Sequence, residues 1–500
     1  MSLPVAILLS LAIPLAGAVL IALAHRRPNL REAVTLVTSG LMFLTVASLV
    51  PEVMAGGRPE ATLIEMLPGL PLRFEVEPLG MMFGLLASGL WIVTSVYSIG
   101  YMRANDEAHQ TRYYVCFALA LASTIGVAFA GNMMTLFVFY EALTLSTYPL
   151  VAHKGTDQAM RGGRTYLGLL LFTSIGLQLL GILWTWRIAG TLDFTVGGIL
   201  AGKASGPVVG ILLLLYVYGI GKAALMPFHR WLPAAMVAPT PVSALLHAVA
   251  VVKAGVFTVM KVVVYIFGID LLAASGQNLW LIYLAAASLL IASLVALTKD
   301  NLKARLAYST ISQLAYVVLG AALATSWGVI GGSMHIAMHA MGKITLFFCA
   351  GAIYTATHKT EVSELAGLGR VMPFTFGAFL IGALSIIGLP PFGGLWGKWY
   401  LALGALDAGQ VAIVAVLMIS SLLNIAYLMP IPLKGFFGGA PGNSGHDNPG
   451  DGNPGHGEPS AIKEAPLPCL IAIGVTAFGC LALFFFPGPI YDLLRTIDLR

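Results

Sequence analysis

The sequence predicts an all-α, polytopic membrane protein of about 14 transmembrane helices, built from two five-helix repeats with broken helices 7 and 12. Its composition supports the membrane class, because 58% of the 500 residues are apolar and only 10% are charged. Soluble domains carry charges at roughly 25% of positions. Apolar runs of about 20 residues, the length that a helix needs to cross a bilayer, recur along the whole chain. A bilayer is therefore the expected solvent of this chain.

The apolar runs are the expected spans of the protein. They lie near 3–23, 34–51, 78–99, 113–130, 133–152, 165–188, 207–226, 241–265, 280–297, 302–324, 328–357, 373–403, 410–436 and 467–488. The first run has no basic segment before it and is followed by basic residues. We therefore expect a first span rather than a cleaved signal peptide.

The runs divide the chain into five parts. Residues 1–110 hold three peripheral helices, 111–270 and 278–437 each hold a five-helix half-channel unit, 438–466 form a loop rich in Gly and Pro, and 467–500 hold the last helix and a short tail. Because the loop composition cannot bury a core, we expect this loop to be disordered. Each five-helix unit carries a break in its fourth span, which indicates a repeated plan.

The basic residues predict the orientation of the chain in the membrane, and the cysteines argue against a metal or redox site. Most of the 27 Lys and Arg residues fall in loops on one side, and the positive-inside rule then places both termini outside a cell inner (plasma) membrane. The four cysteines lie in apolar runs without metal-ligand spacing. No dinucleotide fingerprint, Walker motif or cysteine cluster is present. We therefore expect no cofactor, no metal site, no redox centre and no nucleic-acid partner.

Ionisable residues inside the predicted spans are the main functional signal, because each costs about 2.5–3.5 kcal/mol near the bilayer centre. They are Glu141, Lys222, Lys253, Lys261, Lys343 and Lys398. Such residues normally mark an ion path, whereas a residue near the end of a span can extend to the headgroups. The second interpretation is favoured only for Lys261.

Glu141 and Lys222 are the expected switch of the first unit. Glu141 lies deep in FVFYEALTLSTYPL and needs a nearby cation, while Lys222 lies in YVYGIGKAALMPFHRWLP, where Pro227 weakens the helix. Opposite charges hold each other ionised in a low dielectric, so a Glu–Lys pair that separates and re-forms can release and bind a proton. A static ion pair that fixes helix packing is the alternative.

Histidines and lysines form a second set of candidates. His335, His339 and Lys343 are spaced i, i+4, i+8, which places them within about 80° on one helix face and predicts a polar relay. His247 and Lys253 are six positions apart, so we expect them to serve different neighbours. HIAMH lacks the glutamate of HExxH, which excludes a zinc protease.

Lys398 follows a second predicted break. The segment SIIGLPPFGGLWGKWYL interrupts its span with two prolines and two glycines before this lysine. Irregular backbone at membrane depth is tolerated only where protein or a wet cavity satisfies it. We therefore expect Lys398 to end a half-channel.

Five segments together resemble the antiporter-like membrane subunits shared by respiratory complex I and Mrp-type Na⁺/H⁺ antiporters. They are FVFYEALTLSTYPL, KAALMPFHRWLPAAMVAPTPVSALLHAVAVVKAG, KDNLKARLAYSTISQLAY, HIAMHAMGKITLFFCAG and GLPPFGGLWGKWYL, and the likeness runs from about residue 75 to 435. The resemblance implies fourteen helices with two half-channels and a charged axis. The lysine after the second break resembles the D subunit of Mrp antiporters or the smallest complex I homologue, and the Gly-rich insertion departs from both patterns.

The resemblance also implies residue roles. Glu141 and Lys222 match the charged pair, Lys253 the bridging lysine and Lys398 the lysine of the last half-channel, while His247, His335, His339 and Lys343 match the polar connections.

Three functions follow from these observations. The first is a proton-translocating subunit of a Mrp-like antiporter, and the second is a proton-pumping subunit of complex I or of a hydrogenase-type redox complex. A structural scaffold is the third, and it leaves the cost of the buried charges unexplained. The expected partners are other membrane subunits, the lipid bilayer, protons and Na⁺ or another monovalent cation. The chain is expected to be a transporter subunit without a redox centre of its own.

Overall fold

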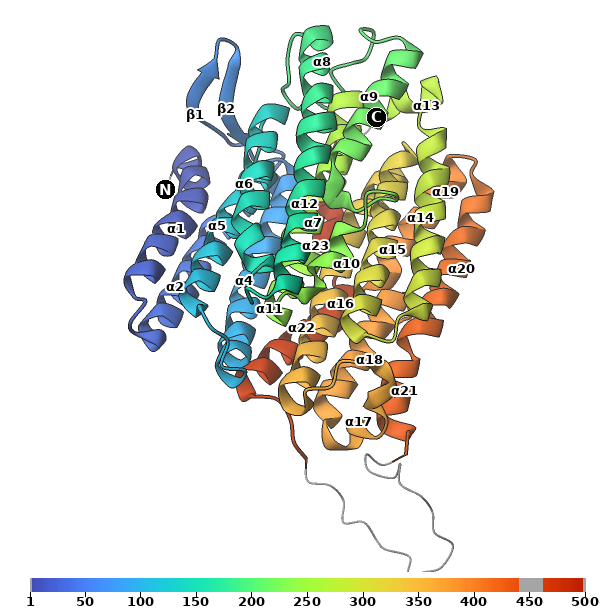
Figure 1. The fold of residues 1–500 in the computed structure, drawn as a ribbon. Helices are drawn as coiled ribbons and strands as arrows, with labels where there is room; N and C mark the ends of the chain where they lie inside the picture. The colour runs from blue at the N-terminus through green and yellow to red at the C-terminus, as the bar shows by residue number, and fades with distance from the viewer. Residues whose placement is uncertain (1, 440–461, 498–500) are drawn as a thin grey trace, which may run out of the picture.

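The computed structural model describes residues 2–439 and 462–497, and helices make up most of it. The helices run side by side along one main direction, with α1 and α2 at one edge of the bundle and α19 and α20 at the opposite edge (Figure 1). The predicted helical membrane fold is confirmed, with one small exception near the amino terminus.

The amino-terminal part contains four helices and a β-hairpin. Its elements are α1 Leu3–Leu23, α2 Pro28–Ala47, α3 Val50–Met54, β1 Glu60–Leu67, β2 Leu70–Glu75 and α4 Pro78–Ala104. The hairpin is antiparallel, turns at Gly69 with φ of 76°, and projects from one end of the bundle (Figure 1). Because β2 alternates buried and half-buried residues, it favours a strand over a helix. This hairpin adds a short two-stranded sheet to the predicted helical fold.

The next part contains the first broken helix. Its elements are α5 Gln110–Ala128, α6 Met133–Val151, α7 Asp157–Thr173, the π turn η1 Ser174–Gln178, α8 Leu179–Ala189, α9 Gly206–Gly219, the 3₁₀ turn η2 Gly221–Ala223, α10 Trp231–Ala234, the 3₁₀ turn η3 Ala235–Val237, α11 Thr240–Ala244, the π turn η4 Leu245–Val249, α12 Val251–Lys261, the π turn η5 Val262–Phe267 and α13 Ile269–Ser275.

The last part contains the second broken helix. Its elements are α14 Leu279–Thr298, α15 Leu302–Ala322, α16 Ser326–Thr357, the 3₁₀ turn η6 Val362–Leu365, α17 Leu368–Val371, α18 Pro373–Ile387, α19 Gly394–Asp407, α20 Val411–Leu428, α21 Pro430–Phe437, α22 Leu467–Phe485 and α23 Gly488–Leu494.

Eleven helices within the described residues are long and apolar enough to cross a membrane. The count of fourteen is not confirmed, because three predicted spans correspond to helices that are shorter, broken or more polar. The span near 207–226 is the short α9, that near 302–324 is α15, and that near 373–403 is the pair α18 and α19.

Two long helices form the centre of the bundle. The helix Thr240–Phe267, which includes α11 and α12, is wholly buried, and α16 is 94% buried over its most apolar window. Small residues allow neighbours to approach closely: a Cβ on Gly331 of α16 would lie 2.6 Å from the Leu401 nitrogen of α19. The candidate histidines and lysines of these two helices therefore lie away from the lipid.

The end of the predicted loop is attached to the bundle. Residues 440–461 lie outside the described residues, so most of the predicted disorder is not described. Within 462–466, however, the Lys463 nitrogen donates to the Val371 carbonyl at 2.9 Å. Glu464 accepts hydrogen bonds from the backbone nitrogens of Phe374 and Thr375, at 2.7 and 3.2 Å. These contacts cap α18, whose first backbone N–H groups have no partner within the helix.

Candidate functional site

Lys222 lies in the first helix break. Helix α9 ends at Gly219, and the chain continues through the turn Gly221–Ala223 with Ala224 in a left-handed conformation. This interruption begins before Pro227, to which the sequence analysis attributed it. The ammonium group of Lys222 is buried and donates to the Tyr140 carbonyl at 2.8 Å and to the Thr144 hydroxyl at 2.5 Å.

Glu141 and Lys222 do not form the predicted direct ion pair. Both carboxylate oxygens of Glu141 are buried without a hydrogen-bond partner among the described residues. Tyr140 and Glu141 are consecutive in α6, so their side chains leave the helix about 100° apart. Lys222 contacts the carbonyl of Tyr140 and lies 3.2 Å from the centre of its ring, which replaces the expected carboxylate contact.

The break at Lys222 packs directly on α12. A Cβ added to Gly255 of α12 would lie 2.3 Å from both the Ala223 nitrogen and the Lys222 carbonyl carbon. Only glycine permits this approach. Lys253 precedes Gly255 by two positions, so the close contact brings the backbone of the break near the helix that carries Lys253.

Lys253, His339 and His335 form a continuous buried row. The Lys253 ammonium and the His339 Nδ1 are hydrogen-bonding partners. The His339 and His335 rings stack with centroids 5.9 Å apart, and His335 Nε2 bonds to Gln313 Oε1 at 3.0 Å. All three ionisable side chains are at most 2% exposed. Their hydrogen bonds and ring contacts link α12, α15 and α16.

His247 and Lys253 contact different residues of one helix, α16: Phe347 for His247 and His339 for Lys253. The His247 ring lies 4.7 Å from the Phe347 ring of α16, and neither nitrogen of the His247 ring has a partner among the described residues. His247 lies in the π turn Leu245–Val249. A π turn takes one more residue than an α turn, so it rotates the preceding residues relative to a regular helix.

Lys343 leaves the row of histidines and contacts α15. Its ammonium donates to the Ser309 hydroxyl at 2.6 Å, and this hydroxyl lies 2.8 Å from the Tyr427 hydroxyl. Tyr427 in turn donates to Asn424 at 2.6 Å. The predicted stripe therefore divides between Lys343, which leads toward α20, and the two histidines.

Lys398 lies just beyond the second break. Helix α18 ends at Ile387, Gly388 follows with φ of 87°, and α19 begins at Gly394. The Lys398 ammonium donates to the Ile387 carbonyl at 2.8 Å and to the Ser421 hydroxyl at 3.1 Å. The predicted combination of a broken helix and a lysine is therefore present.

Tyr316 connects Lys398 to the central row. Its ring centre lies 4.9 Å from the Lys398 ammonium and 5.2 Å from the ring of His335. A Cβ on Gly397 would lie 2.9 Å from His335, so α19 approaches α16 closely at this point. The resulting row of contacting side chains is Lys253, His339, His335, Tyr316 and Lys398.

Several residues of this site were missed by the sequence reasoning. Ser309, Gln313 and Tyr316 lie in LAYSTISQLAY of α15 at i, i+4 and i+7, so helical spacing of polar residues was an available signal. Thr144 was likewise missed, although it lies three positions after Glu141.

Lys261 does not extend to the headgroups as expected. Its side chain is fully buried, its ammonium donates to the Ala130 carbonyl at 2.7 Å, and it lies 3.4 Å from a Glu77 oxygen. The other Glu77 oxygen accepts from the Tyr265 hydroxyl at 2.8 Å. The prediction was wrong because Glu77 lies outside the predicted spans and was not considered as a partner.

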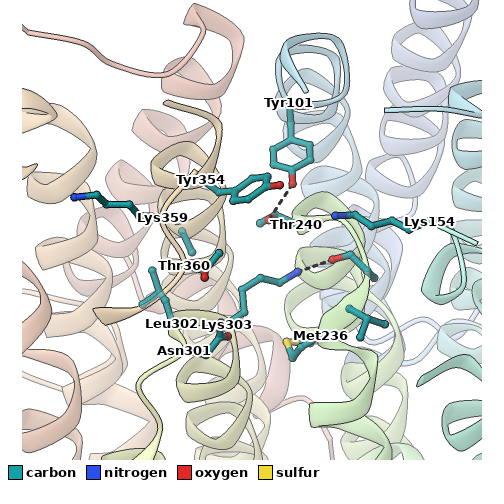
Figure 2. A pocket seen from close by; sticks show the side chains of 13 residues that line it. Tyr101, Lys154, Met236, Thr240, Asn301, Leu302, Lys303, Tyr354, Lys359 and Thr360 are labelled. Carbon is teal, nitrogen blue, oxygen red and sulfur yellow. Dashed lines mark hydrogen bonds between the residues drawn. The ribbon is translucent and has the colours of Figure 1, made fainter. Parts of the chain in front are cut away.

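A pocket of about 170 Å³, lined in part by three lysines, lies at the end of the central helices. Figure 2 shows Lys154 and Lys303 reaching into it beside Thr240 and Tyr354. The Lys303 ammonium donates to the Ala238 carbonyl at 2.5 Å. Among the described residues, the ionisable side chains that line the pocket are lysines and tyrosines. Near the pocket, burial raises the pKa of the Glu107 carboxyl, against the opposing effect of Lys154 and Lys303.

Among residues 2–439 and 462–497, no group of three His, Cys, Asp or Glu side chains is placed to hold a metal ion. The four cysteines are free thiols.

Comparison with known proteins identifies the family. Residues 130–424 match the family described as NADH:quinone oxidoreductase/Mrp antiporter, transmembrane region. The chain belongs to this family. The matched region contains every site residue that the sequence analysis proposed, so the predicted resemblance is confirmed.

Relatives in the antiporter-like family come from both kinds of complex. The N subunit of NADH-quinone oxidoreductase from Desulforudis audaxviator is 32% identical over 75% of this chain and 74% of its own length. The L subunit of NADH-quinone oxidoreductase from Mycobacterium tuberculosis is 31% identical over 88% of this chain and 71% of its own length. The A subunit of the Na⁺/H⁺ antiporter from Alkalihalophilus pseudofirmus is 30% identical over 77% of this chain, but only 50% of its own length.

Solved structures share the fold. A chain of the Mrp complex from Dietzia sp. superposes with a TM-score of 0.85 at 23% identity, covering 99% of this chain and 97% of that chain. A chain of the archaeal membrane-bound sulfane sulfur reductase superposes with a TM-score of 0.83 at 24% identity, covering 98% of this chain and 96% of that chain. Both are multisubunit membrane complexes. The family match and the relatives of 30% identity or more show that this protein is a multi-pass antiporter-like membrane subunit.

Proposed function

We propose that the protein is the proton-translocating subunit of a Mrp-like antiporter that exchanges Na⁺ or another monovalent cation for protons. The observation that carries this proposal is the buried row from Lys253 through His339, His335 and Tyr316 to Lys398. Four of these five side chains can bind and release a proton at or near neutral pH when their surroundings are tuned. Burying so many such groups is costly, and transport accounts for that cost.

In this proposal, each of the two helix breaks serves one five-helix unit. Lys222 and Glu141 serve the first five-helix unit, residues 111–270, and Lys398 serves the second, residues 278–437. Lys253 joins the units by its contact with His339, while Lys343 and His247 extend the polar network on either side. Because Lys222 touches α12 through backbone atoms, a change at the first break alters the surroundings of Lys253 without a direct side-chain contact.

The lysine-lined pocket supports a further part of the proposal. Ala350 lines it and lies seven positions after Lys343, on the same face of α16. The pocket is therefore the mouth of the path on the side that the positive-inside rule places inside, with both termini outside. Its lysines repel hydrated cations more strongly than they hinder proton transfer through hydroxyl groups.

A second candidate function is proton pumping within complex I or a related redox complex. The relatives named as NADH-quinone oxidoreductase subunits favour it. In that case, electrons would be carried by other chains, and the same row would move protons. Measuring Na⁺-dependent proton movement without an electron donor separates the two functions, since a redox-driven pump remains silent under that condition.

The principal test replaces Lys398 in the assembled complex. We expect Lys398→Ala to reduce proton flux into membrane vesicles at least tenfold, because the row loses its final ionisable group. Lys398→Arg retains the charge and should retain part of the flux. Lys434→Ala is the control, because Lys434 is exposed on α21. Normal flux in Lys398→Ala, at normal membrane abundance, would remove this row from the transport path.

A further inference from the structure

A cavity beside Lys398 opens toward the lipid-facing side of the bundle. It has a volume of about 380 Å³ and lies between the second helix break, α19 and α20. At its edge, Trp399 is 55% exposed, and Met418 and Leu422 are each 65% exposed. These helices lie at the edge of the bundle that is farthest from α1 (Figure 1). The cavity is within the size range of small-molecule sites.

Among the described residues, Lys398 is the only ionisable one that lines this cavity. The remaining lining is apolar, apart from the Ser421 hydroxyl, the Trp399 indole nitrogen and backbone atoms. Charged groups at membrane depth normally face the protein interior or pair with an opposite charge. Lys398 has no acidic partner in the part of the chain that the structure describes, because its ammonium donates to a carbonyl and to a hydroxyl. One of its three donors is left for another acceptor.

The lining defines the chemistry of a complementary ligand. A carboxylate accepts short, strong hydrogen bonds from an ammonium group and from a hydroxyl, so Lys398 and Ser421 suit a single carboxylate. The apolar remainder of the cavity suits an alkyl chain, which gains stability for each methylene that it buries. The exposed mouth provides access from the hydrocarbon phase. A bulky phospholipid headgroup fits poorly, because its charge belongs at the membrane surface.

We propose that this cavity binds a long-chain carboxylate, that is, the anion of a fatty acid, with its carboxylate at Lys398 and Ser421 and its chain along α19 and α20. The bound anion neutralises Lys398 at the end of the buried row. If the proposed transport function holds, occupancy slows proton flux. The binding itself does not depend on that function.

Trp399 provides a direct measure of binding. A brominated fatty acid quenches tryptophan fluorescence at short range, so 9,10-dibromostearate should quench the purified complex in detergent with a saturating curve. We expect its methyl ester, which lacks the charge, to need at least a tenfold higher concentration. Trp399→Phe should remove most of the saturable component, since the quenched tryptophan is then absent.

Two alanine positions provide the matched comparison. Ala402 lines the cavity one helical turn after Lys398, so Ala402→Phe should fill the cavity and abolish saturable quenching, and the effect of oleate is measured relative to each variant's own basal flux. Ala415 is exposed on α20 but does not line the cavity, so Ala415→Phe should leave quenching intact. Oleate should then inhibit flux in the parent and in Ala415→Phe, but not in Ala402→Phe.

Three results would overturn the proposal. Equal quenching by the acid and its ester would mean general partitioning of apolar chains. Unchanged quenching in Ala402→Phe would place the ligand elsewhere, and absence of saturable quenching in the parent would mean that another group, such as a neighbouring protein of the complex, covers the cavity. Saturable quenching without any effect of oleate on flux would instead keep the binding site and count against the role of Lys398 in transport.

Discussion

Removing the Thr144 hydroxyl tests whether the Lys222 ammonium works in transport. Thr144→Val keeps the side-chain shape but deletes a 2.5 Å hydrogen bond to Lys222. A hydrogen bond to a charged group is worth about 1.5–3 kcal/mol. Each 1.36 kcal/mol changes a rate tenfold, so flux should fall by about tenfold to 150-fold if the charged lysine is an intermediate.

The assay is proton flux in vesicles that contain the assembled complex, normalised to the abundance of this protein in the membrane. Thr144→Ser retains the hydroxyl and should remain within a few-fold of the parent. Thr124→Val is the matched control, because the buried Thr124 hydroxyl on α5 bonds only to the Ala120 carbonyl of its own helix. Flux within twofold of the parent in Thr144→Val would refute the reasoning that Lys222 must be held charged at this position.

Three further predictions follow from the same structure. Glu141→Ala and Lys222→Ala should each abolish proton flux, and the double variant should have little less flux than either single variant, because steps in series fail together. If the fold-losses of flux in the two single variants multiply in the double variant, the two residues are independent sites. Gly397→Ala should lower both the melting temperature and the proton flux, because the added Cβ would lie 2.9 Å from His335. Gly377→Ala is the control and should change neither quantity, because its added Cβ would have no neighbour within 4 Å. Burial lowers the pKa of the His153 imidazole to about 4 from 6.5, so below pH 6.5 the unfolded chain binds a proton that the folded chain does not. Thermal stability in detergent should therefore fall between pH 7 and pH 5, and His153→Gln should reduce this fall; an unchanged pH dependence would count against it.

Composition and helical spacing predicted much of this molecule. Apolar runs identified the spans, and the prolines and glycines after Ile386 located the second break. The i, i+4 spacing of His335 and His339 predicted a shared face, and their rings stack. These features depend on residues that are close in sequence, for which periodicity is a reliable guide.

Contacts between distant segments were not predictable in the same way. One partner of Lys222 is the Tyr140 carbonyl, a group that every residue carries, and the other is the hydroxyl of Thr144, 78 positions away in the sequence. Glu77 and Lys261 are 184 positions apart, and Glu77 follows a hairpin that apolar runs do not reveal. The π turn at His247 changes the helical phase locally, and a calculation that assumes 3.6 residues per turn cannot include it.

The attachment of residues 462–466 has a mechanical consequence. Glu464 accepts three hydrogen bonds from the first turn of α18, at 2.5–3.2 Å, two residues before the cap of α22. A force applied to the chain at Ile462 therefore acts first on α18, through these hydrogen bonds, and reaches α22 only after they break. Helix α18 ends at the second break, beside Lys398. A pull on residues 462–466 therefore acts on a helix that leads directly to this lysine.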